Sequence, residues 1–290
     1  MVADFPPTGE VLKMDGTRVH AHQEGVGPDV ILLHGAGGNT RDFTFDLMGR
    51  LTDRFRVTAF DRPGLGHSDP LHSDGESPFE QAAILEVACG RLGLGPAVLV
   101  GHSFGGSVAL AWALDYPDRA AALVSLAGAA LPWQGGLGPW YEFASTQLGG
   151  AVLIPMISAF APRALAHTTL ARIFEPDPVP EGYADHIGIE LSLRPASLRA
   201  NTRQVNGLKP HIRRMAARYD ELAMPIEIVH GSADKIVPVE VHSRPLAERV
   251  SSVHLTELNG HGHMPHHARP DAAVAAIARA ADRAGLAGAA

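Results

Sequence analysis

The stretch AVLVGHSFGGSVALAWAL, residues 97–114, decides the fold. Its apolar start predicts a buried strand over 97–100, and its end predicts a helix over 107–114. Between them lies GHSFG, which fits the pattern G-x-S-x-G. The pattern alone is weakly diagnostic, but between a strand and a helix it indicates a sharp elbow with a serine at its tip. We therefore predict that Ser103 is held exposed in a strained turn and acts as a nucleophile.

Apolar runs alternate with helical patterns along most of the chain. Such alternation, with strands that are apolar throughout, is typical of a parallel sheet covered by helices on both faces. The expected fold is α/β, a mostly parallel doubly wound sheet with an antiparallel edge hairpin at 11–12 and 18–22. The expected strands are 29–34, 56–60, 97–100, 121–126, 225–231 and 253–258, and the expected helices are 39–51, 76–92, 107–114, 237–249 and 270–284.

A proline-rich segment without strong strand patterns interrupts this alternation. We expect residues 1–130 and 220–290 to form the core domain and residues 131–219 to form a helical cap inserted into it. Ligands of open α/β sheets bind outside the carboxyl ends of the strands. A cap folded over that edge would bury the substrate and exclude water.

A serine hydroxyl needs a base within hydrogen-bond reach, and the base needs a carboxylate to orient it. Both should come from loops that follow later strands. Asp234 directly follows the expected strand 225–231, and His261 and His263 both follow 253–258. We expect Asp234 to orient the base, but the chemistry of the residues does not separate His261 from His263.

An oxyanion formed at Ser103 also needs two hydrogen-bond donors. The glycine-rich loop HGAGG, residues 34–38, follows an apolar strand, and its glycines allow the backbone to approach a substrate closely. We expect the N–H groups of Ala36 and Phe104 to form the oxyanion hole.

Five motifs in chain order make the sequence resemble the capped α/β-hydrolase superfamily over essentially the whole chain except the cap. In that superfamily the histidine after the second glycine of the base loop is catalytic, so the resemblance selects His263. The order Ser, Asp, His also matches. The motifs are HGAGG at 34–38, DRPGLGHSD at 61–69, GHSFGG at 101–106, GSADKIVP at 231–238 and GHGHMPHHARPD at 260–271.

The resemblance implies a serine hydrolase that cleaves a small carboxylic ester or lactone through an acyl-enzyme, with Ser103, His263 and Asp234 as its triad. Epoxide hydrolases and haloalkane dehalogenases of this fold carry an aspartate at the elbow, so Ser103 excludes them. Three alternatives stay open: a carbon–carbon bond hydrolase acting on a diketone acid, a cofactor-free haloperoxidase or perhydrolase, and a non-enzymatic ligand receptor or accessory protein with slow turnover.

The composition bounds the partners. The chain has 24 basic and 31 acidic residues, a net charge of −7, which disfavours non-specific binding of nucleic acid or an anionic membrane. The first residues lack the features of a secretory signal, and Cys89 is the single cysteine. We expect a cytoplasmic protein with a small-molecule substrate and no nucleic-acid or membrane partner, and homo-oligomer formation stays open.

Neither a cofactor nor a metal is expected. Four surplus histidines raise the alternative of a metal site, but no acid–histidine or cysteine–histidine framework stands elsewhere at ligand spacing. These histidines are His254, His261, His266 and His267.

The segment 194–218 is basic throughout and contains no Asp or Glu. It could recruit an anionic substrate, or it could be a solvated basic face with salt bridges to the acidic core. The sequence does not decide between the two, and it assigns no residue to substrate binding.

Overall fold

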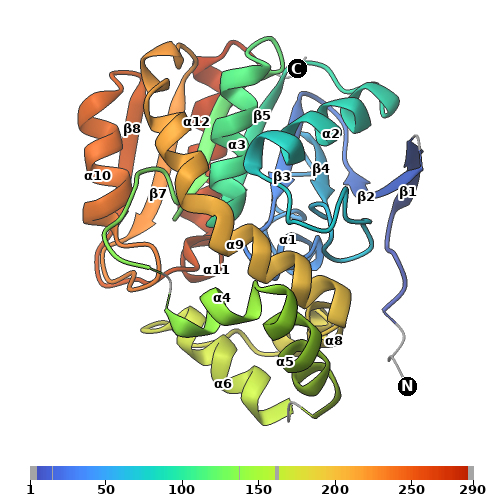
Figure 1. Ribbon diagram of the computed structural model, residues 1–290. Coiled ribbons are helices and arrows are strands. Elements are labelled where there is room, and N and C mark those ends of the chain that lie inside the picture. The colour runs from blue at the N-terminus through green and yellow to red at the C-terminus, as the bar shows by residue number, and fades with distance from the viewer. Residues whose placement is uncertain (1–4, 15, 137, 161–162, 287–290) are drawn as a thin grey trace.

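The computed structural model describes residues 5–14, 16–136, 138–160 and 163–286 (Figure 1). Its strands are β1 (Glu10–Met14), β2 (Thr17–Glu24), β3 (Asp29–Leu33), β4 (Arg56–Phe60), β5 (Ala97–His102), β6 (Ala120–Leu126), β7 (Ile226–Gly231) and β8 (Val253–Leu258). Its helices are α1 (Arg41–Thr44), α2 (Pro78–Arg91), α3 (Phe104–Asp115), α4 (Pro139–Ala144), α5 (Gln147–Phe160), α6 (Arg163–Phe174), α7 (Tyr183–His186), α8 (Ile189–Ser192), α9 (Pro195–Ala216), the 3-10 turn η1 (Tyr219–Glu221), α10 (Val239–Arg249), α11 (Pro265–Ala268) and α12 (Pro270–Arg283).

The strands form one eight-stranded sheet in the order β1-β2-β4-β3-β5-β6-β7-β8. β1 and β2 are antiparallel to each other, and β2 is antiparallel to β4, whereas all remaining pairs are parallel. The predicted α/β class, the mostly parallel sheet and the antiparallel edge hairpin are therefore confirmed. Parallel pairing places the carboxyl ends of β3, β5, β7 and β8 at one edge of the sheet.

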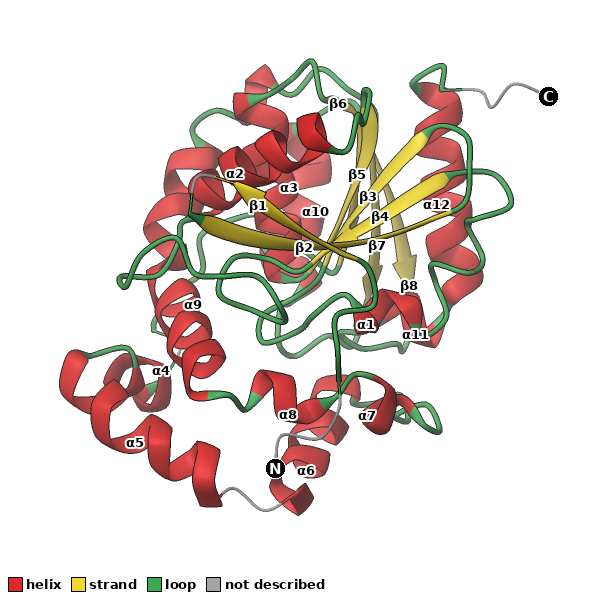
Figure 2. Cartoon of the chain, turned by 90° about the vertical axis from the view of Figure 1, so that its right-hand side faces the viewer, coloured by secondary structure: helices red, strands yellow, loops and turns green. Residues whose placement is uncertain are grey.

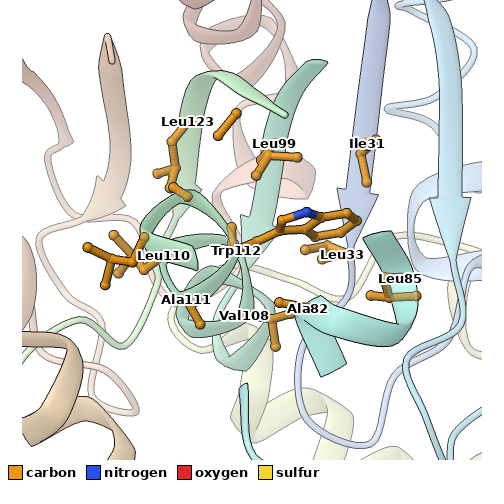
Figure 3. Close-up of a cluster of buried hydrophobic side chains, with 14 of the residues drawn as sticks. Ile31, Leu33, Ala82, Leu85, Leu99, Val108, Leu110, Ala111, Trp112 and Leu123 are labelled. Atoms are coloured by element: carbon orange, nitrogen blue, oxygen red, sulfur yellow. The ribbon is translucent and has the colours of Figure 1, made fainter. Parts of the chain in front are cut away.

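Helices cover both faces of the sheet (Figure 2). One apolar cluster joins the sheet to α2, α3, α9 and α10, and a second joins the other face to α12 and to residues 43–55. Trp112 of α3 is fully buried among Ile31, Leu33 and Leu99 (Figure 3). Its indole N–H donates to Glu86 of α2 at 2.8 Å, which satisfies the one polar atom of this large side chain.

The predicted helix over 39–51 is largely wrong. Only Arg41–Thr44 are α-helical, and turns follow. The apolar spacing did identify the buried face, because Phe43, Leu47 and Leu51 all lie in the second core cluster. After Phe45 the regular spacing of four residues is lost, because Met48 N–H donates to Phe43 O and Leu51 N–H donates to Met48 O. Burial of the side chains thus overrides a weak helical preference in this segment.

Residues 127–225 lie between the adjacent strands β6 and β7, and we call them the helical insertion. Its helices α4 to α8 gather beyond one end of the sheet (Figures 1 and 2). Two bonds tie it to the loop after β3: the Ser192 hydroxyl donates to Gly37 O at 2.6 Å, and the Asn39 amide donates to Ile187 O at 2.9 Å. Its last helix, α9, buries Val205, Leu208 and Ile212 in the first core cluster.

Of the described helices, none combines the length and the apolarity needed to cross a membrane.

Candidate active site

Ser103 occupies a strained elbow between β5 and α3. Its φ of 52° and ψ of −116° lie outside the regions that residues other than glycine normally adopt. The elbow depends on small neighbours, because a Cβ at Gly101 would lie 2.2 Å from Gly105 O and one at Gly105 would lie 2.1 Å from Leu33 O. Contrary to the expectation that it stands exposed, Ser103 retains only 9% of its accessible surface. Gly35 covers it closely, since a Cβ there would lie 3.2 Å from Ser103 Cβ.

Three predicted residues form one hydrogen-bonded line. His263 Nε2 lies 2.9 Å from Ser103 Oγ, and His263 Nδ1 lies 2.7 Å from Asp234 Oδ2. The residues come from the loops after β5, β7 and β8, and all three are buried. The structure thus brings together the hydroxyl, imidazole and carboxylate that the sequence indicated.

Asp234 is held as a carboxylate. Its Oδ1 accepts the N–H groups of Ile236 and Val237 at 2.8 and 2.9 Å, and its Oδ2 accepts from His230 Nε2 at 3.1 Å as well as from His263. Burial by itself would raise the pKa of Asp234, but these hydrogen bonds and the charge of His263 hold the pKa well below its ordinary value. A carboxylate fixed by four donors can orient an imidazole without taking its proton.

The backbone N–H groups of Ala36 and Phe104 are free. Among the described residues, neither N–H finds an acceptor in the protein. Phe104 is the first residue of α3, where N–H groups have no partner within the helix and the helix dipole favours negative charge. Both groups can therefore donate to a ligand.

Arg62, which the sequence did not single out, anchors the loop that carries Ala36. Its guanidinium is fully buried and donates to His34 O and Gly35 O, both at 2.8 Å. It also donates to the side chains of Gln81 at 2.8 Å and Gln204 at 3.0 Å. Burial lowers the pKa of Arg62 to about 9, against the opposing charge of Glu76.

Arg62 also covers the elbow, because its guanidinium carbon lies 4.4 Å from the centre of the Phe104 ring. Its neighbour His34 is neutral: burial, together with the charge of Arg62, lowers the pKa of His34 to about 4. His34 Nε2 accepts the backbone N–H of Arg62 at 3.0 Å, a bond that protonation of Nε2 would remove. One signal in the sequence pointed here, namely the DRPGLGHSD motif at 61–69, which contributed to the family resemblance but assigned no role to Arg62.

His261 occupies a different position from His263. Its Nδ1 lies 2.8 Å from Asp177 Oδ1 of the helical insertion, and it is partly exposed. The geometry therefore separates the two histidines that the chemistry of the sequence left open.

A second buried carboxylate gathers the remaining histidines of this loop. Asp42 accepts from Tyr183 Oη at 2.7 Å, and it lies 2.8 Å from His267 Nε2 and 3.2 Å from His266 Nε2. Burial would raise the pKa of Asp42, but these histidines hold it well below its ordinary value. Asp42 could not be linked to this loop from the sequence, because 224 residues separate it from His266.

The group Asp42, His266 and His267 has a donor set that suits a divalent metal. A metal-bound histidine normally donates its other ring N–H to a carboxylate, carbonyl or water. Nδ1 of His266 is buried without such a partner among the described residues. The arrangement therefore fits a hydrogen-bonded network better than a metal centre.

The basic segment 194–218 is largely engaged by the protein itself. Arg218 pairs with Asp115 at 2.6 Å and Glu221 at 2.9 Å, and Arg194 donates to Gly66 O at 3.3 Å. Arg203 donates to Ser73 O, and Lys209 donates to Gly135 O at 2.7 Å. Of these four residues Arg218 pairs with carboxylates, whereas Arg194, Arg203 and Lys209 donate to backbone carbonyls, so carboxylates of the described residues neutralise only part of the segment.

Comparison with known proteins identifies one family. Residues 28–270 match the sequence pattern described as alpha/beta hydrolase fold. A crystal structure of an alpha/beta hydrolase fold protein from Burkholderia ambifaria superimposes with a TM-score of 0.78 at 23% identity, covering 92% of this chain and 96% of that one.

Two curated relatives show the range of the similarity. The 2-hydroxy-6-oxononadienedioate/2-hydroxy-6-oxononatrienedioate hydrolase of Burkholderia vietnamiensis is 38% identical over 39% of this chain, and that match spans only 42% of the relative. The pimeloyl-[acyl-carrier protein] methyl ester esterase of Vibrio vulnificus is 28% identical over 78% of this chain and 83% of its own.

Proposed function

The chain belongs to the alpha/beta hydrolase fold family, and on that premise we propose that it is a hydrolase that cleaves a small carboxylic ester or lactone through an acyl-enzyme formed on Ser103. The observation that carries the proposal is the continuous line from Ser103 Oγ through His263 to Asp234, at 2.9 and 2.7 Å. The N–H groups of Ala36 and Phe104, which have no acceptor among the described residues, support it. Phe104 directly follows Ser103, and Ala36 follows Gly35, which lies against Ser103.

In the proposed reaction Ser103 Oγ attacks the substrate carbonyl while His263 Nε2 takes the hydroxyl proton. The Ala36 and Phe104 N–H groups bind the oxyanion of the tetrahedral intermediate. His263 then gives its proton to the leaving alcohol, and the acyl group remains on Ser103. A water molecule, activated by the same histidine, hydrolyses the acyl-enzyme and restores Ser103. Asp234 fixes the tautomer of His263 and stabilises its imidazolium form.

The proposal includes a role for the helical insertion as a cap that shields the acyl-enzyme from bulk water. The hydrogen bonds of Ser192 and Asn39 support this role, because they join the insertion to the loop after β3, which carries Ala36. The substrate is a small molecule under this proposal. The cytoplasmic location remains a prediction, supported only by the single, buried cysteine Cys89.

The decisive test is labelling of the protein with a fluorophosphonate, read by intact mass and peptide mapping. We expect one adduct on Ser103 and none in Ser103→Ala, whose turnover of acyl nitrophenyl esters should fall by several orders of magnitude. A Ser103→Ala variant that keeps most of its ester turnover would refute the assignment.

The two histidines of the base loop give a matched comparison. His263→Ala should lose nearly all ester turnover and most of the labelling rate, whereas His261→Ala should keep both within about tenfold, because His261 does not contact Ser103. The reverse result would assign the base to His261.

A second candidate is hydrolysis of a carbon–carbon bond in a diketone acid by the same residues. The name of the Burkholderia vietnamiensis relative favours it, since that protein is named as a hydrolase of 2-hydroxy-6-oxo dienedioates and trienedioates. Arg194, Arg203 and Arg218 already donate to groups of the protein, which leaves fewer cations of the segment 194–218 to bind a dianionic substrate. Steady-state assays with a panel of esters, lactones and a vinylogous diketo acid separate the two candidates.

A further inference from the structure

The loop that carries His263 rests on the helical insertion at its amino-terminal side. Asp177 follows α6, and its Oδ2 accepts the N–H of Gly262 at 2.8 Å. Its Oδ1 lies 2.8 Å from Nδ1 of His261. One carboxylate thus binds both residues that precede His263, and only 14% of its side chain is accessible.

The insertion and the base loop also pass each other without room for a side chain. A Cβ at Gly262 would lie 2.2 Å from Glu175 O. On the opposite side, a Cβ at Gly231 would lie 2.3 Å from Gly262 O, so the peptide of Gly262 is enclosed between the insertion and the end of β7. Any shift of residues 175–177 must therefore move the peptide that leads into His263.

The carboxyl-terminal side of His263 is held in a similar way. Phe174 and Tyr183 of the insertion form a small apolar cluster with Met264. His102 Nε2 lies 3.0 Å from the carbonyl oxygen of His263 itself. Burial and the charges of His266 and His263 hold the pKa of His102 well below its ordinary value, so His102 is a neutral donor to that carbonyl.

We propose that Asp177 is a positioning residue for the base: it fixes the Gly262 peptide and thereby sets the distance from His263 Nε2 to Ser103 Oγ. The inference rests on the proposed function, because it assigns a role relative to that base. Asp177 lies outside the line of reacting groups and acts only through the backbone of the base loop. The helical insertion thereby contributes to the chemical step as well as to covering the site.

The experiment compares Asp177→Ala, Asp177→Asn and Asp185→Ala by steady-state ester hydrolysis and by the rate of fluorophosphonate labelling. Asp185 is a matched control, since it is an exposed aspartate of the same insertion for which the described residues offer no ion pair. We expect Asp177→Ala to lower kcat by about 10- to 100-fold with KM changed less than about threefold, because a misplaced base slows chemistry without removing a substrate contact. The labelling rate should fall in parallel.

The asparagine variant tests the mechanism of positioning. Its carboxamide oxygen still accepts the Gly262 N–H, so we expect Asp177→Asn to retain kcat within about fivefold of the parent. Asp177→Asn also protects the test against a folding defect in the alanine variant, and the urea midpoints of all variants are measured together.

Three results would overturn the inference: an unchanged kcat in Asp177→Ala, a rise in KM alone, or an asparagine variant as slow as the alanine variant. Failure of the proposed function would look different. In that case the parent protein itself would not be labelled at Ser103, whatever residue stands at 177.

Discussion

Replacing Arg62 by methionine tests whether this buried cation stabilises the fold and also holds in place the loop 34–38, which carries Ala36. Methionine keeps the unbranched stem but removes donors from His34 O, Gly35 O, Gln81 and Gln204. Gly35 O has a second partner in His34 Nδ1 at 2.9 Å, whereas the two buried glutamines keep only the bonds that their amide N–H groups donate. The loss therefore falls on His34 O and on the side-chain oxygens of Gln81 and Gln204, and the buried Glu76 also loses an opposing charge.

A buried acceptor left without its donor costs about 1–3 kcal/mol, so the acceptors that lose Arg62 together cost about 3–5 kcal/mol. We expect Arg62→Met to lose about that much free energy of unfolding. We also expect kcat for an ester to fall by about 10²-fold, the effect of losing one oxyanion donor, because the peptide that carries the Ala36 N–H is no longer anchored.

The assay is urea unfolding followed by circular dichroism, together with ester kinetics below the unfolding transition. Arg50→Met is the control, since Arg50 forms a surface pair with Asp46, four residues earlier, and its loss should change the stability by less than about 1 kcal/mol. A stability of Arg62→Met within about 1 kcal/mol of the parent would refute the reasoning. An unchanged kcat in Arg62→Met would refute only the role of Arg62 in anchoring the loop that carries Ala36.

Three further changes probe the proposed triad, the elbow and the buried histidines. Asp234→Asn should lower kcat by about 10⁴-fold, because a carboxamide N–H facing His263 Nδ1 imposes the wrong tautomer; stopped-assay kinetics check this, and a loss below tenfold would contradict it. Gly105→Ala should prevent folding or cost more than about 3 kcal/mol, since its Cβ would lie 2.1 Å from a β3 carbonyl; a soluble variant with a parental urea midpoint would disprove the close approach. The pKa of His34 and that of His242 are both lowered to about 4 by burial, so the unfolded chain takes up these protons first and stability falls as the pH drops from about 6.5 to 4, by up to about 3 kcal/mol per histidine. Urea titrations at pH 7 and 4.5 measure this slope, and His242→Gln, which keeps an acceptor for the Leu131 N–H, should reduce it; an equal slope in both proteins would rule His242 out.

Local patterns in the sequence were sufficient to predict the sheet and the hydrogen-bonded line of Ser103, His263 and Asp234. The apolar strand before GHSFGG, together with glycines that tolerate close backbone contact, indicated the elbow at Ser103. Asp234 and His263 could be located because each directly follows a strand whose carboxyl end meets the same edge of the sheet. The choice of His263 over His261 needed a resemblance, because both imidazoles follow the same strand.

The supporting residues could not be predicted in this way. Arg62 meets Gln204 across 142 residues, and Asp177 meets Gly262 across 85 residues. Neither residue lies in a periodic pattern that indicates its partner. The residue type alone also does not predict whether an arginine is buried or exposed to solvent. The helix predicted over 39–51 failed for a related reason, since the spacing of Phe43 and Leu47 reports burial of a face and not the hydrogen bonds of the backbone.

Helix α9 contacts the sheet through both apolar and hydrogen-bonded side chains, which limits where segments of the insertion could be exchanged between this protein and its relatives. This helix returns the chain to β7 and shares a core with the sheet through Val205 and Ile212, while Gln204 bonds both Arg62 and Glu76. An exchange that ended after α9 would replace half of these contacts with mismatched ones. A chimera joined near Arg194 would leave the helix with its native sheet and transplant only the preceding segment. If such a chimera had altered substrate selectivity and the same free energy of unfolding as the parent, Arg194 would be a suitable junction for exchanging substrate preference.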